Sequence, residues 1–191
     1  MEYALTRTVE PAEEPISHDE ARAHMRAADD EPPTVIESFI KACRVHTEDI
    51  SSCMLCTQTW KMTIDYCFPQ EIRIPLRPVQ SITSIKYIDE AGVQQTLAAG
   101  KYKLAKGFIA RINPAYNESW PGTRAEREAV EIIFIGGFGA AKDVPETLKL
   151  AIKLLLAHYS ENREATIPGV SLQSIPMGYD RLVGPERVWR V

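Results

Sequence analysis

The fold class is decided by residues 130–162, VEIIFIGGFGAAKDVPETLKLAIKLLLAHYSEN. Val130–Ile135 is the most apolar run of the chain and predicts a buried strand. From residue 141 to 163 the apolar side chains recur at helical spacing, which predicts a long C-terminal helix with one apolar face. The glycines at 136–139 favour a positive-φ turn that takes the chain from strand to helix. A strand followed directly by an amphipathic helix indicates an α+β protein.

Working upstream, the hydrophobic period is two over much of residues 57–140. Trp60, Met62 and Ile64 alternate with polar residues, as expected for a half-buried strand. Several further short apolar runs follow, and they predict a small antiparallel sheet or barrel. Residues 113–129 interrupt it with an irregular loop that carries Tyr116 and Trp120.

The helical period dominates residues 16–56. Ser17 followed by Glu20 is a capping box that begins a short helix, and a second helix is predicted over about 34–52. That second helix has one apolar face, as does the helix at 141–163. Two such faces are best buried against each other, so we expect a helical bundle in which the N-terminal helices pack on the long C-terminal helix. The sheet or barrel is then an insertion in this bundle.

The two ends of the chain have different compositions from the middle. Residues 1–15 are polar and acidic, and predict a flexible N-terminal arm. Residues 164–191 contain several prolines and glycines among scattered apolar side chains, including Trp189. This composition predicts an extended C-terminal arm that lies in a groove of its own subunit or of a neighbour. We expect one structural domain overall.

Composition excludes several classes of protein. The 191 residues are 45% hydrophobic and 25% charged, which excludes a disordered chain and a disulfide-stapled miniprotein. The net charge of −4 disfavours a dedicated DNA-binding protein, because no global basic field is available to hold the phosphate backbone. The apolar runs are too short to cross a bilayer, and we expect a soluble protein made in the cytosol, with no membrane contact.

The sequence contains few candidates for chemistry. Cys53 and Cys56 have the spacing of zinc ligands, but Cys43 and Cys67 stand singly, so the thiols are interpreted as small apolar side chains at a helix-to-strand corner. His158 on the C-terminal helix could serve as a base in a cleft. No catalytic, cofactor-binding or metal site is therefore predicted. Two alternatives remain open: a small α+β enzyme or ligand-binding domain with a cleft near His158, and a zinc-dependent interaction module.

Several short motifs occur in a characteristic order. They are EPISHDEARAHMR at 14–26, TQTW at 57–60, IPLRPVQSI at 74–82, NESWP at 117–121, GFG at 137–139 with VP at 144–145 and LK at 148–149, YSENRE at 159–164, and RVW at 187–189. In this order the chain resembles, from about residue 14 to 191, the head-tail connector (adaptor) proteins of long-tailed phages, prophages and gene transfer agents. The corner Cys53–Cys56 departs from the pattern, because relatives usually have a polar, glycine-containing turn there.

The resemblance implies a structural role. Connectors of this family form a ring, usually of twelve copies, below the portal protein, and the ring extends the DNA channel and docks a neck, stopper or tail-terminator protein. The implied location is the neck of a virion or gene transfer agent particle. The family has no catalytic residues. We expect DNA to pass without sequence-specific binding, along a neutral to acidic surface. Four aromatic residues are the predicted contacts between subunits or with partners: Tyr116, Trp120, Tyr179 and Trp189.

Overall fold

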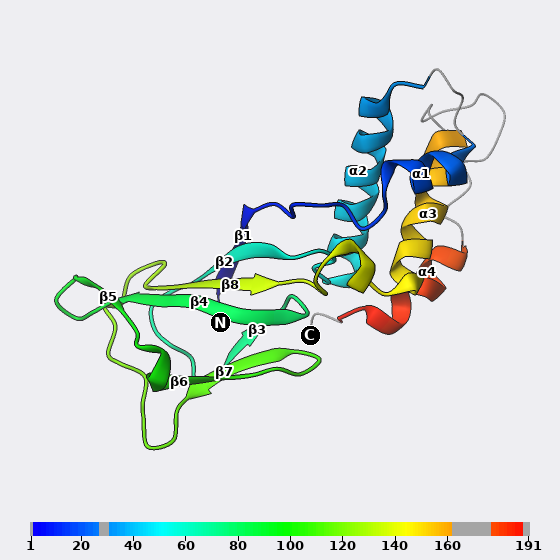
Figure 1. Cartoon of the computed structure of the whole chain (residues 1–191). Coiled ribbons are helices and arrows are strands. Elements are labelled where there is room, and N and C mark those ends of the chain that lie inside the picture. Colours follow the sequence, from blue (N-terminus) through cyan, green and yellow to red (C-terminus); the bar gives the residue numbers. More distant parts are fainter. Residues whose placement is uncertain (1, 27–30, 162–176, 189–191) are drawn as a thin grey trace. The chain divides into compact units, whose positions relative to one another are not determined.

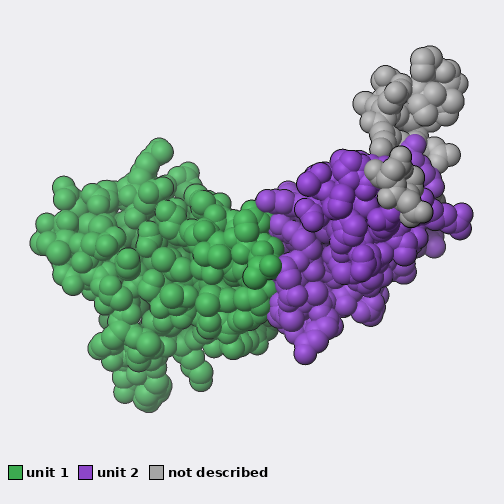
Figure 2. All heavy atoms as spheres, turned by 45° about the horizontal axis from the view of Figure 1, so that its top comes forward, with its two compact units in different colours: residues 1–12, 57–137 green, residues 13–56, 138–191 purple. Residues whose placement is uncertain are grey.

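Residues 2–26, 31–161 and 177–188 are described by the computed structural model of the chain (Figure 1). The protein contains helices and two antiparallel sheets, which confirms the α+β class. The chain divides into two units, coloured separately in Figure 2. Residues 1–12 and 57–137 form a β unit, and residues 13–56 and 138–191 form a helical unit.

The β unit is built around a five-stranded sheet with the order β1-β2-β8-β4-β5. Its strands are β1 (Tyr3–Val9), β2 (Gln58–Ile64), β4 (Val79–Ile88), β5 (Gln94–Thr96) and β8 (Val130–Gly136). The most apolar strand, β8, takes the central place between β2 and β4, with Phe134 opposite Trp60 and Ile132 opposite Ile85. Alternate side chains of β8 are fully buried, because one face of this strand covers the core.

A second sheet of three strands has the order β3-β7-β6. Its strands are β3 (Ile72–Ile74), β6 (Tyr102–Ala105), which follows the 3-10 turn η1 (Ala99–Lys101), and β7 (Ala110–Pro114). The side chains of Ile72, Ile74 and Ile112 are buried, whereas Arg73 and Arg111, which precede or follow them in the strands, are exposed. This sheet therefore has one apolar face and one solvent-exposed face. No helix or strand is assigned to residues 115–129, where the irregular loop is predicted.

The N-terminal residues differ from the predicted flexible arm. Residues 3–9 of the expected arm 1–15 form β1, an edge strand that pairs antiparallel with β2. The guanidinium carbon of Arg7 lies 5.0 Å from the centroid of the Trp60 ring, and Thr8 donates a hydrogen bond to the carbonyl of Thr59. An edge strand needs few apolar side chains, because most of its stability comes from the ladder of backbone hydrogen bonds. Polar composition alone therefore gave the wrong prediction for this segment.

The helical unit contains α1 (His18–Met25), α2 (Pro33–Ser51), α3 (Glu146–Glu161) and α4 (Met177–Val183), with the short 3-10 turns η2 (Ala141–Asp143) and η3 (Gly184–Glu186). Buried apolar residues from all four α helices form one core, among them Ala21, Ile36, Ile152 and Val183. The predicted capping box is present: the Ser17 hydroxyl accepts a hydrogen bond from the backbone N–H of Glu20, and the Glu20 carboxylate accepts one from the N–H of Ser17.

In the part of the chain that the structure describes, no helix is long and apolar enough to span a bilayer.

The turn between β8 and η2 requires glycine. Gly137 has a φ of 124° and Gly139 a φ of 136°, both in the region that L-residues with a side chain avoid. A Cβ at residue 139 would also lie 2.6 Å from Oδ2 of Asp143, whose carboxylate accepts a hydrogen bond from the N–H of Ala140. The interpretation of these glycines as a strand-to-helix turn is confirmed.

The C-terminal segment contains regular structure in its described part. Residues 177–183 of the predicted arm 164–191 form α4, which packs on α3, and the N–H of Val188 donates to the carbonyl of Ser51. Tyr179 and Val183 are buried in the helical core. Glycine and proline at 178, 184 and 185 made the stretch resemble an irregular arm, but the seven-residue helix α4, which includes Gly178, is stabilised by packing rather than by propensity.

Candidate functional site

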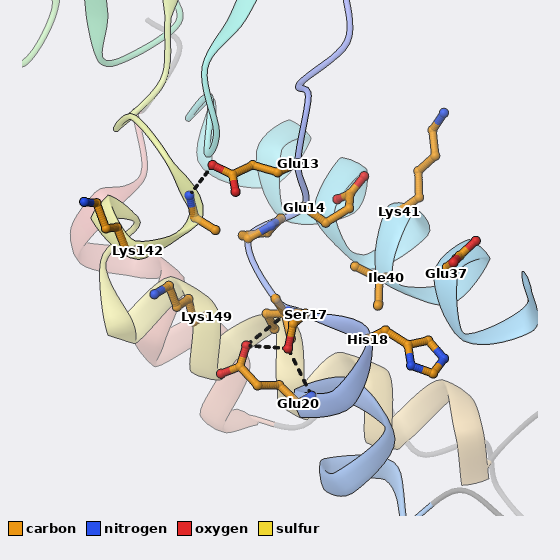
Figure 3. Close-up of a pocket in the computed structure, with 13 residues that line it drawn as sticks. Glu13, Glu14, Ser17, His18, Glu20, Glu37, Ile40, Lys41, Lys142 and Lys149 are labelled. Atoms are coloured by element: carbon orange, nitrogen blue, oxygen red, sulfur yellow. Dashed lines mark hydrogen bonds between the residues drawn. The ribbon is translucent and has the colours of Figure 1, made fainter. Parts of the chain in front are cut away.

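A groove of about 770 Å³ opens on the helical unit (Figure 3). Its floor includes the buried side chains of Pro15, Ile16 and Ile40. Charged side chains line its walls: Glu13, Glu14, Glu20, Glu37, Lys41, Lys142 and Lys149. The groove therefore combines an apolar floor with charges of both signs, a composition suited to a polypeptide.

The segment 13–17, which forms part of the groove, is held by hydrogen bonds to η2 and to α1. Oε1 of Glu13 accepts from the backbone N–H of Ala141, at the start of η2, at 2.9 Å. Glu20 begins α1 through its capping box and also accepts from Nζ of Lys153 on α3 at 3.1 Å. The backbone hydrogen bond at Ser17, followed by Lys153, holds the pKa of Glu20 below its ordinary value. These carboxylates act as fixed anions that order the groove.

Beside the groove, a buried arginine joins three parts of the helical unit. Nε of Arg44 on α2 donates to Glu14 at 2.7 Å, and its Nη1 donates to Glu48, one turn along α2, at 2.9 Å. The other oxygen of Glu48 accepts from the backbone N–H of Leu55 at 3.0 Å. Arg44 is 1% exposed and Glu48 4% exposed, so both charges are satisfied inside the protein. The arginine thereby fixes segment 13–17 and the corner at 53–56 against α2.

The structure places three of the four thiols in the interior. Cys43 on α2 and Cys53 and Cys56 at the corner belong to the core of the helical unit. Burial of Cys53 and Cys56 confirms their interpretation as small apolar side chains at a corner. Burial raises the pKa of both the Cys43 and the Cys56 thiols to about 12. Zinc binds the thiolate, so this environment opposes a thiolate site. Sγ of Cys53 instead donates a weak hydrogen bond to the carbonyl of Glu186 in η3 at 3.3 Å.

His158 lies half-buried on α3, with its ring centroid 5.9 Å from that of Tyr159. His158 is not one of the described residues that line the groove of Figure 3. The cleft postulated for a small enzyme is therefore not the groove that the helical unit contains.

Tyr116 projects from a turn that is tightly held. Its side chain is 93% exposed, far more than any other large apolar side chain of the described residues. The N–H of Ala115 donates to the carbonyl of Lys101, and Nζ of Lys101 donates to both carboxylate oxygens of Glu118, at 2.9 and 2.7 Å. The backbone of the turn is thus fixed while the aromatic ring remains in solvent. A pre-organised, exposed tyrosine is a side chain suited to an interface.

Trp120, in the same loop, is packed within the β unit. Its ring stacks on Phe68 with centroids 4.8 Å apart and planes 6° apart, and its Nε1 donates to the carbonyl of Gln70 at 3.4 Å. The ring is half-buried, so one part of it remains available to a partner. The two aromatic residues of this loop thus differ: Tyr116 is exposed to solvent, whereas Trp120 anchors the loop to the β unit.

The remaining two predicted contact residues belong to the C-terminal segment. Tyr179 on α4 is fully buried, and its hydroxyl donates to Oγ1 of Thr47 on α2 at 3.1 Å. The side chain that was expected at the surface thus contributes to the core of its own helical unit. Burial raises its pKa to about 12. Trp189 lies outside the described residues.

Phe108 is one of the exposed aromatic residues that were not singled out from the sequence. Phe108, between β6 and β7, is half exposed, and the guanidinium carbon of Arg77 lies 4.0 Å from the centroid of its ring. The sequence signal was the run Lys106–Gly107–Phe108, which has a turn residue next to a large aromatic. Its pairing with Arg77 depends on tertiary structure.

Three solved structures have the same fold as this chain. A chain of the structure titled "Neck of empty GTA particle computed with C6 symmetry" matches it with a TM-score of 0.80 and 26% identity, covering 98% of this chain and 97% of that one. Over nearly its whole length, this chain is therefore similar to a protein of a gene transfer agent neck. Matches to "Virion of native gene transfer agent (GTA) particle" and "Neck of native GTA particle computed with C12 symmetry" have TM-scores of 0.79 and 0.72, each at 24% identity and covering 98% of this chain, and 96% and 97% of theirs. No protein-family model and no curated protein matches the sequence.

The similarity extends over both units of this chain, because each match covers 98% of it. The candidates in the described residues are the groove of the helical unit and the exposed turn at Tyr116.

Proposed function

We propose that this chain is a structural protein of the neck of a gene transfer agent or related phage particle, located where the head joins the tail. The observation that carries the proposal is the match with a gene transfer agent neck over 98% of the chain at a TM-score of 0.80 and 26% identity. The role is structural rather than enzymatic, since the solved neighbours are components of virions and necks.

In more detail, the chain forms a ring of twelve copies below the portal protein, extends the DNA channel, and docks a stopper or tail-terminator protein. The support is that the titles of the neighbouring structures give C12 and C6 symmetry to the necks. A cyclic ring is made of heterologous contacts, in which one surface of a copy meets a different surface of the next. DNA passes through without sequence-specific binding, in keeping with the net charge of −4.

Particular segments would supply the contacts. The helical bundle of α1, α2 and α3 carries the groove, which receives a polypeptide segment of a neighbour or partner. The exposed Tyr116 turn and the C-terminal segment 164–191, with Trp189, are further contact regions. Trp120 supports the Tyr116 loop from within through its stack on Phe68, and Tyr179 fixes α4 through Thr47.

The experiment is a deletion of the gene in the producing cell, with complementation by the wild-type chain. We expect DNA-filled heads and separate tails in the deletion strain, and joined particles after complementation. Electron microscopy counts the joined particles, and mass spectrometry of purified necks locates the chain. Joined, infective particles at a normal yield in the deletion strain would contradict the proposal, as would turnover of a substrate by the purified protein.

Tyr116 provides a sharper test of the contact regions. Tyr116→Ala removes a 93% exposed ring and leaves the backbone of its turn in place, so the melting temperature should be unchanged. Since truncation of a central interface aromatic commonly costs about 2 kcal/mol or more, incorporation into particles should fall at least about tenfold. Val93→Ala, at another exposed apolar residue of the same unit, is the matched control and should assemble normally. Equal incorporation of both variants would remove Tyr116 from the interface.

A further inference from the structure

The exposed face of the three-stranded sheet carries a cluster of positive charge. Arg73 on β3 and Arg111 on β7 are directly opposite each other in the sheet. Lys103 on β6 is exposed, opposite Asn113, the residue two positions after Arg111 on β7. We call Arg73, Lys103 and Arg111 the basic face. Like charges on directly opposite residues destabilise a sheet, so this arrangement needs a compensating anion.

Glu71 supplies that anion within the chain. Its Oε1 accepts from Nε of Arg73 at 2.7 Å, and its Oε2 lies 3.7 Å from Nη1 of Arg111. The hydrogen bond from Arg73, and then the positive charge of Arg111, holds the pKa of Glu71 below its ordinary value. The two arginines remain 67% and 51% exposed. One carboxylate thus orients two guanidinium groups without removing them from solvent, so the local charge of the face remains positive.

The two units of the chain differ in charge. The β unit has eleven Lys and Arg against ten Asp and Glu, whereas the helical unit has eleven against sixteen. The acidic character of the protein therefore resides in the helical unit. A basic face on one unit and an acidic surplus on the other are complementary between two copies of the same chain.

We propose that the basic face binds the helical unit of a second copy of this chain. This inference rests on the proposed function as a ring subunit, and it names one of the heterologous contacts of that ring. The oriented guanidinium pair recognises carboxylates of the neighbouring copy, because a guanidinium presents parallel N–H donors that match a carboxylate. Lys103 adds a third positive charge at the edge of the contact.

An acidic protein surface fits this face better than DNA does. Tight binding to a duplex takes about 6–10 phosphate contacts, whereas the basic face has three cations around a carboxylate. The β unit as a whole has a surplus of one positive charge, which is too small to attract a polyanion. DNA is therefore the competing partner that the experiment must exclude.

The test uses intact particles that carry a photo-crosslinking amino acid, p-benzoylphenylalanine, in place of Lys103. After irradiation, mass spectrometry of the purified necks should identify crosslinks to residues 13–56 or 138–191 of another copy. Crosslinks to DNA, to the portal or to any other protein would overturn the inference while leaving the neck location intact. Absence of the chain from purified necks would instead overturn the proposed function itself.

A charge reversal tests the energetics. R73E/R111E should lower incorporation into particles at least about tenfold, because like charges then face each other across the contact. R124E/R127E makes the same change of net charge as R73E/R111E, at two exposed residues of the loop 115–129 in the same unit. This control should assemble as the wild type does. R73K/R111K keeps the charge but loses the paired N–H donors, so its incorporation should fall between that of the wild type and that of R73E/R111E.

Folding and DNA binding are checked on the same variants. Circular dichroism melting should show that R73E/R111E remains folded at the assembly temperature, with a slightly lowered melting temperature, because the two new carboxylates face each other and Glu71 on an exposed surface. Fluorescence anisotropy with a 30-base-pair duplex at physiological salt should show equally weak binding for wild type and R73E/R111E. Normal assembly of R73E/R111E, or a duplex affinity that is lost with the two arginines, would refute the inference.

Discussion

Arg44→Met should destabilise the helical unit strongly, because it removes the positive charge between two carboxylates. In the wild type the guanidinium donates to Glu14 at 2.7 Å and to Glu48 at 2.9 Å, and its side chain is 1% exposed. Methionine is apolar and unbranched but shorter than arginine, so a smaller packing loss accompanies the electrostatic one. The electrostatic loss falls unequally on the two carboxylates.

The magnitude follows from the exposure of each carboxylate. Glu14 is 31% exposed and can be solvated again, whereas Glu48 is 4% exposed and keeps the Leu55 N–H as a donor. Breaking a buried ion pair by removing one partner costs about 3–5 kcal/mol, and the retained donor favours the lower end, about 3 kcal/mol. At about 2–4 °C per kcal/mol for a chain of this size, the melting temperature should fall by roughly 6–12 °C.

The assay is urea unfolding followed by circular dichroism at 222 nm, which reports on the helical unit. Arg44→Met combined with Glu48→Gln should recover more than half of the lost free energy, since glutamine still accepts from Leu55 without a charge. Glu14→Gln in the wild-type background should cost less than about 1 kcal/mol, because that carboxylate is partly solvated. If Arg44→Met unfolded within about 0.5 kcal/mol of the wild type, or if Glu48→Gln restored nothing, the buried pair would not hold the corner as described.

Three further predictions concern the interior. Tyr179→Phe should lower the free energy of unfolding by about 1 kcal/mol, because one hydrogen bond is lost, and Tyr179→Ala should lower it by about 3–5 kcal/mol, because a cavity is left. Urea unfolding measures both values. Equal losses for the two variants would mean that α4 is not packed as described. Gly139→Ala should lower the free energy of unfolding by about 1–3 kcal/mol because of its φ of 136° and the close Asp143 carboxylate, whereas Gly184→Ala, with open space at its Cβ, should be nearly neutral. Since the pKa of the Cys56 thiol is raised to about 12, only about one in ten thousand of the Cys56 thiols is ionised at pH 8. Iodoacetamide should therefore label only the exposed Cys67 rapidly in the folded protein, as followed by intact mass spectrometry, and unfolding should expose all four thiols. Rapid labelling of a second thiol in the folded protein would contradict the burial.

Local patterns in the sequence predicted most of the elements. The capping box at Ser17 and Glu20, the period of two over β2 and the apolar strand β8 are properties of neighbouring residues, and the structure contains each of them. The second predicted helix has no such cap: α2 begins at Pro33, and no side chain caps it. Proline fits the first turn of a helix, where its missing N–H would have had no partner in any case.

The candidate surfaces were predicted less completely. Exposure of Tyr116 could be expected from its loop, but Trp120 and Tyr179 have the same kind of side chain and are packed inside their own units. A large aromatic is suited to a core and to an interface for the same reason, its apolar area, so the residue type alone does not decide between them. The basic face was missed because Arg73 and Arg111 are far apart in sequence and meet only through the pairing of β3 with β7.

The sequence by itself determined the α+β class, the strand-to-helix turn at Gly137 and Gly139, and the resemblance to connectors, since all three are written in local patterns and their order. Tertiary structure alone decided that residues 3–9 form an edge strand, that Arg44 is buried between Glu14 and Glu48, and that α4 returns to the helical core. Each of these depends on contacts between residues distant in sequence. Backbone pairing and charge burial gain their free energy only when the partner has been brought into place by the rest of the fold.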